Sequence, residues 1–98
     1  MTERMIYIPE YRNEDFEWDY DYPTCLALAA ASKLYRWLHD RVNRHGPFRC
    51  HVFTDLGSHV CTVELDHEQD HWTPEDIAAY LEGEAENVLV ECFEKYND

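Results

Sequence analysis

Glycine and positive charge are both scarce in this chain of 98 residues. Its three glycines leave little material for the loops that cradle phosphates, and the sequence has no nucleotide-binding fingerprint or nucleophile elbow. No apolar run approaches the roughly 20 residues of a membrane span. The first residues also lack the apolar stretch of a secretory signal. We therefore expect a cytoplasmic protein that has no membrane association and no cofactor.

Negative charge dominates the composition, because 21 acidic residues stand against 8 basic ones and the formal net charge is -13. Such a charge repels DNA, RNA and anionic membranes, and it attracts basic proteins. We therefore expect the partner to be a basic protein or a ribonucleoprotein complex, with no direct binding to nucleic acid. The cysteines are spread over segments with helix or strand character, which favours reduced thiols in a cytoplasm: Cys25, Cys50, Cys61 and Cys92.

The periodicity of apolar residues predicts the secondary structure. Residues 4–8 predict a strand, and residues 15–22 alternate acids with aromatic rings, as a half-buried extended segment does. Helical spacing begins after Pro23 and continues to Val42. Residues 48–54 and 59–65 predict a hairpin around Gly57, with His59 on its buried face. Thr73 is expected to cap a second helix that ends at Gly83, and residues 88–93 predict a last strand.

This order of elements predicts one α+β domain over residues 1–98. We expect an antiparallel sheet of about four strands with two helices, in the β-α-β-β-α-β order of the ferredoxin-like fold. Residues 10–22 add an acidic aromatic arm or an extra strand. A fold of this kind hosts many functions, so function has to be argued from particular residues.

One segment matches a catalytic signature. His67-Glu68-Gln69-Asp70-His71 has the H-E-x-x-H spacing of zinc hydrolases, which requires both histidines on one helix. The expected helix begins only at Thr73, so the context does not fit. A structural zinc site is also disfavoured, because strand alternation points Cys50 and His51 to opposite faces. We expect no catalytic residue and no metal ligand, and keep a small metal-binding protein or hydrolase as an alternative.

The acids form rows in which every second residue is a carboxylate. In an extended chain this spacing places carboxylates on one side at intervals of about 6.6 Å. A nucleic-acid strand likewise presents a regular row of negative charge, with one phosphate per roughly 3.4 Å of axis. The three rows are Asp15, Glu17, Asp19 and Asp21; Glu64, Asp66, Glu68 and Asp70; and Glu82, Glu84 and Glu86.

These rows have no counter-charges beside them, since every basic residue except Lys95 precedes residue 50. Like charges on neighbouring positions destabilise a monomer, so unpaired rows are easier to explain if a partner completes them. Trp18 and Tyr20, which alternate with the first row, anchor that row to the domain or contact the partner as aromatic hot spots. We therefore predict that all three rows and these two rings bind the partner.

In size, charge and carboxylate rows the sequence resembles, as a class, the small acidic inhibitors encoded by phages, including anti-CRISPR proteins and other DNA mimics. The resemblance implies a host defence complex as the target, such as a type I CRISPR surveillance complex. The carboxylates would replace phosphates in its DNA groove. An immunity or antitoxin protein that binds a basic nuclease is the alternative. Either function would suit a monomer or a homodimer and would not make the chain an enzyme.

Overall fold

The computed structural model describes residues 4–40, 42 and 44–96, with side chains as far as Glu91. The elements follow in the order β1 (Met5–Arg12), β2 (Trp18–Tyr20), α1 (Ala27–His39), β3 (His45–Thr54), β4 (His59–Leu65), the 3-10 turn η1 (His67–Gln69) and α2 (Pro74–Tyr96). Within this part of the chain, no helix combines the length and the apolar character needed to cross a bilayer.

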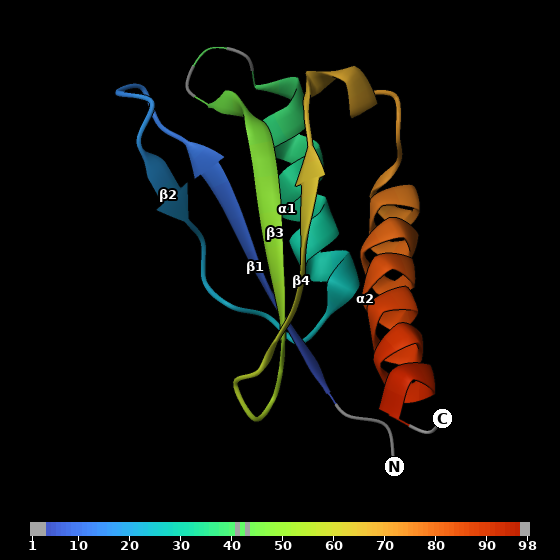
Figure 1. Ribbon diagram of the computed structural model, residues 1–98. Coiled ribbons are helices and arrows are strands. Elements are labelled where there is room, and N and C mark those ends of the chain that lie inside the picture. The colour runs from blue at the N-terminus through green and yellow to red at the C-terminus, as the bar shows by residue number, and fades with distance from the viewer. Residues whose placement is uncertain (1–3, 41, 43, 97–98) are drawn as a thin grey trace.

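The strands form one antiparallel sheet in the order β2-β1-β3-β4. Both helices cover the same face of this sheet, with α1 behind the central strands and α2 beside β4 (Figure 1). No described element covers the opposite face, which we call the open face. The α+β class, with a four-stranded antiparallel sheet and two helices, is therefore confirmed.

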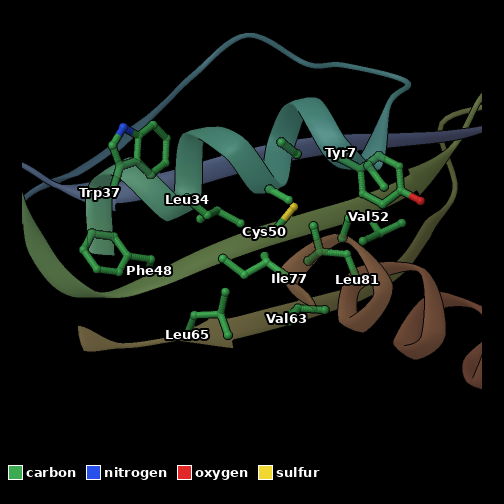
Figure 2. Close-up of a cluster of buried hydrophobic side chains, with 14 of the residues drawn as sticks. Tyr7, Leu34, Trp37, Phe48, Cys50, Val52, Val63, Leu65, Ile77 and Leu81 are labelled. Carbon is green, nitrogen blue, oxygen red and sulfur yellow. The ribbon is translucent and has the colours of Figure 1, made fainter. Parts of the chain in front are cut away.

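Alternation along the strands builds the core between the sheet and the helices. In β3 the side chains of Phe48, Cys50 and Val52 are buried, while the residues between them are only half buried. From α1, small alanines and Leu34 approach the sheet at helical spacing. Figure 2 shows Cys50 near the middle of this cluster, beside Leu34, and Ile77 of α2 completing it from the other side.

The first turn of α2 follows the sequence prediction closely. The Thr73 hydroxyl accepts from the Asp76 backbone N–H, and the Asp76 carboxylate accepts from the Thr73 backbone N–H. This reciprocal pair caps the helix in the way that a threonine followed three residues later by an acid predicts.

The prediction for the rest of α2 is wrong. The helix passes through Gly83 and includes residues 88–93, which were expected to form a strand. The ferredoxin-like order is therefore not confirmed, because the strand beside β1 is β2, from the 10–22 segment. Glycine costs a helix only about 1 kcal/mol relative to alanine. Buried Leu81 and Ala85 on either side of Gly83 supply packing that offsets this cost.

Two further residues do not lie where the sequence predicts them, which is the buried face of the hairpin for His59 and the first helix for Val42. His59 is exposed on the open face, because an irregularity between Val52 and Phe53 in the β3–β4 pairing shifts the alternation at the start of β4. Val42 is 79% exposed, since α1 ends at His39, before the helix reaches it.

Candidate functional site

The first acidic row lies on the tip and edge of the sheet. Asp15 and Glu17 belong to a turn that Asn13 organises, because the Asn13 side-chain oxygen accepts from both of their backbone N–H groups, at 2.9 and 3.1 Å. Phe16 between them has a φ of 59°, which closes this turn. Asp19 lies in β2, at the outer edge of the sheet (Figure 1). All three carboxylate residues are exposed.

Rings and acids point to opposite faces of β2. Trp18 is paired across the sheet with Arg12, on the open face, and Asp19 is paired with Tyr11, on the helix side. The Trp18 ring lies under two guanidinium groups, with its centroid 3.5 Å from the Arg49 carbon and 4.7 Å from that of Arg12. Trp18 is therefore held to the body of the domain by cation–π contacts.

Other rings of this segment are free to contact a partner. Tyr20 is 70% exposed, and Tyr22 is 84% exposed. Exposed aromatic side chains beside charged groups are common at protein interfaces. The 16–22 segment thus carries an anchoring ring, Trp18, and available rings near the same acids.

The last acid of the first row is already neutralised. Lys33 Nζ in α1 lies 3.0 Å from the Asp21 carboxylate. Burial alone would raise the pKa of Asp21, but hydrogen bonds from the Tyr22 backbone N–H and from Lys33 outweigh burial and lower it. By contrast, no ion pair to Asp15, Glu17 or Asp19 is found among the described residues. The row thus offers these three carboxylates to a partner.

The second row is extended only at its start. Glu64 lies in β4, opposite Arg49 of β3. Asp66 then caps η1, because its carboxylate accepts from the His67 N–H, while Gln69 Oε1 accepts from the Asp66 N–H. The chain therefore turns after Leu65, and the prediction of one straight row through Glu68 and Asp70 is wrong.

The third row lies on a helix, so its expected extended spacing is also wrong. Residues two apart on a helix point to different sides. Burial raises the pKa of Tyr7, and the nearby Glu82 charge raises it further. The pKa of Cys61 is likewise raised by burial and then by Glu84. Glu82 lies beside Met5 and Tyr7 of β1, while Glu84 is half-buried.

The hydrolase-like segment does not have the geometry of its signature. His67 lies in η1, where its Nδ1 donates to the Leu38 carbonyl oxygen at 2.8 Å and its ring packs against Phe48. His71 is exposed beside Trp72. Across the described part of the chain, no group of three or more His, Cys, Asp or Glu side chains is placed to hold a metal ion.

One polar cluster on the open face does not follow from the sequence patterns. Glu10 is only 6% exposed although it lies on the open face. Its Oε1 accepts from Arg49 Nε at 2.7 Å and from His51 Nε2 at 2.8 Å. His51 Nδ1 and His59 Nε2 each lie 2.9 Å from the Thr62 hydroxyl oxygen. Alternation in 8–12 and 49–53 predicts which side chains point outward. It does not give the register that brings them together.

The comparisons with known proteins give no relative. No family model matches the chain, and neither a curated protein nor a solved structure matches it.

Proposed function

We propose that this protein is an inhibitor that mimics nucleic acid and occupies the cationic groove of a nucleic-acid-binding partner, in the manner of anti-CRISPR proteins. The observation that carries the proposal is the exposed group Asp15, Glu17 and Asp19, to which no described residue supplies a counter-charge. These carboxylates lie on a sheet edge and can enter a groove that a broad face cannot.

Two exposed carboxylates of α2 support the proposal as a second acidic surface. Glu82 and Glu86 are both exposed and one helical turn apart, a rise of about 6 Å. Like charges at this spacing destabilise an isolated helix by a few tenths of a kcal/mol. A cationic group of the partner, placed between the two carboxylates, would offset this repulsion.

The recognition we propose combines steering with anchoring. A net charge of -13 accelerates encounter with a basic groove, and the rate falls as salt screens it. Tyr20 and Tyr22 then contribute apolar contacts, since both are largely exposed. Trp18 acts indirectly in this scheme, because its stacking under Arg49 and Arg12 fixes the segment that bears the acids.

The test is a pull-down from a bacterial lysate with the chain as bait, followed by elution with a duplex DNA oligonucleotide. We expect wild type to capture a basic complex that the duplex releases, and the triple variant Asp15→Lys, Glu17→Lys, Asp19→Lys to capture none of it. The control is a variant with equal charge change at exposed acids outside the predicted binding set, Asp55→Lys, Glu75→Lys, Glu91→Lys, which should keep capture.

Two results would count against the proposal. Capture that survives excess duplex DNA would show that the groove for nucleic acid is not the binding site. Equal loss in the test and control variants would show that net charge, and not the sheet edge, drives binding. Capture of a lone basic nuclease would indicate the immunity or antitoxin alternative.

A further inference from the structure

The open face carries two histidines whose rings converge. Strand alternation puts His51 of β3 on this face, and the irregularity in the β3–β4 pairing puts His59 of β4 there too. Their ring centroids are 6.4 Å apart. His51 Nδ1 and His59 Nε2 each approach the same oxygen, that of Thr62, to 2.9 Å. The two ring nitrogens are therefore directed at one region of space.

The hydrogen bonds of Glu10 determine which His51 nitrogen carries a lone pair. A carboxylate only accepts hydrogen bonds, so His51 Nε2 is the donor in its 2.8 Å contact with Glu10. In a neutral imidazole the other nitrogen, Nδ1, is then an acceptor and faces Thr62. Arg49, at 2.7 Å, holds the same Glu10 oxygen in place.

We propose that His51 and His59 form a binding site for one late first-row divalent ion, such as Zn²⁺, Ni²⁺ or Cu²⁺. Neutral imidazole suits these metals. A histidine ligand almost always donates its second ring N–H to a carboxylate or carbonyl, which fixes the tautomer and the orientation of the ring. Glu10 already does this for His51. Two imidazoles are fewer than a structural zinc site uses, so water completes the coordination.

The surroundings favour cation binding at this place. His59 and Thr62 are exposed, so the ion has direct access from solvent. Because Thr62 donates its one hydroxyl proton to His51 Nδ1, His59 Nε2 donates its own proton to Thr62. When metal binds, the His59 proton moves to Nδ1 of the same ring, and Nε2 exchanges its hydrogen bond to Thr62 for a bond to metal. The strongly negative net charge also raises the local concentration of cations. This site does not include Asp15, Glu17 or Asp19, and it does not depend on the proposed inhibitor function.

The experiment is isothermal titration of the untagged chain with ZnCl₂ and NiCl₂. We expect one ion per chain, with affinity reduced at least about tenfold in His51→Ala and in His59→Ala, as loss of a ligand or its support typically does. His71→Ala is the matched control, because His71 is exposed and lies outside the cluster. Its affinity should equal that of wild type.

A second measurement addresses the tautomer directly and does not depend on whether the variants fold well. Nitrogen-15 spectra of the histidine rings should show a proton on His51 Nε2 before metal is added and a shift of Nδ1 when Zn²⁺ is added. Unchanged binding in both alanine variants, or loss of binding only when His67 or His71 is replaced, would overturn the site. A His51 ring protonated on Nδ1 alone would overturn it as well.

Discussion

The open face of the sheet and helix α2 both carry carboxylates but differ in how those carboxylates are paired. On the open face, Glu10 is buried and accepts hydrogen bonds from Arg49 and His51. On α2, Glu82 and Glu86 are exposed, and no ion pair to them is found among the described residues.

This difference separates acids that hold the fold together from acids that are available to a partner. Removing a buried, paired carboxylate leaves its donors without partners, which is costly. Removing an exposed acid from a surface of like charge relieves repulsion. The two regions should therefore respond to mutation with opposite signs of stability change.

The largest expected effect is that of Glu10→Ala. The substitution leaves Arg49 and His51 without their shared acceptor, and we expect the free energy of unfolding to fall by about 3 kcal/mol. Urea denaturation measures this loss. Glu64→Ala, at an exposed position on the same face, is the control and should change stability by less than about 0.5 kcal/mol. Equal losses in the two variants would show that the Glu10 cluster has no special role in the fold.

This cluster also shows where prediction from sequence stops. The strands, α1, the hairpin and the Thr73 cap follow from periodicity and capping patterns, which are local. The meeting of Glu10 with Arg49 and His51 depends on the register of β1 against β3, which joins residues about 40 positions apart. Local patterns do not determine that register.

The acidic rows illustrate the same limit. Alternation of acids and rings in the first row does place Trp18 and Asp19 on opposite faces of β2. The same spacing in Glu82, Glu84 and Glu86 lies on a helix, because packing of Leu81 and Ala85 outweighs the β-propensity of the valines that follow. Spacing alone therefore does not determine whether acids form a row.

On the helix-covered side of the sheet, the buried Cys50 thiol should make the free energy of unfolding depend on pH. Burial, with a smaller contribution from Cys61, raises the pKa of Cys50 to about 12 from an ordinary 9.0. Below pH 9 the thiol is neutral in both the folded and the unfolded chain. Above pH 9 it ionises only in the unfolded chain, so stability is lost as pH rises from 9 toward 12, by roughly 1 to 2 kcal/mol at pH 10.

Chemical denaturation at pH 8 and pH 10 measures this loss. In Cys50→Ala the decrease between the two pH values should be smaller by the Cys50 contribution, whatever the pH-independent cost of the cavity. Tyr7 and Cys61, whose pKa values are also raised by burial, act in the same direction and leave a residual slope. A slope that does not change in the variant would contradict burial of the thiol.

A smaller effect on stability is expected at Trp18, which attaches the edge strand β2 to the open face. Trp18→Ala removes the ring that stacks under Arg49 and Arg12, and we expect a loss of about 1 kcal/mol. Because β2 is short and lies at the sheet edge, this loss should appear mainly as faster hydrogen exchange of its backbone amides. Trp18→Phe keeps an aromatic face and should exchange at nearly the wild-type rate. If the alanine variant also exchanges at the wild-type rate, the stack does not hold the edge in place.

The smallest effect has the opposite sign and completes the contrast. Glu86→Lys replaces the repulsion between Glu82 and Glu86 with an attraction at i,i+4 spacing, in the favourable order with the acid first. We expect stability to rise by about 0.4 kcal/mol at low salt, with Glu86→Gln giving roughly half of this gain. Concentrated NaCl should remove most of the difference, since screening weakens exposed charge pairs. A loss of stability in Glu86→Lys would mean that the acids of α2 are paired within the chain, and the distinction between the two regions would disappear.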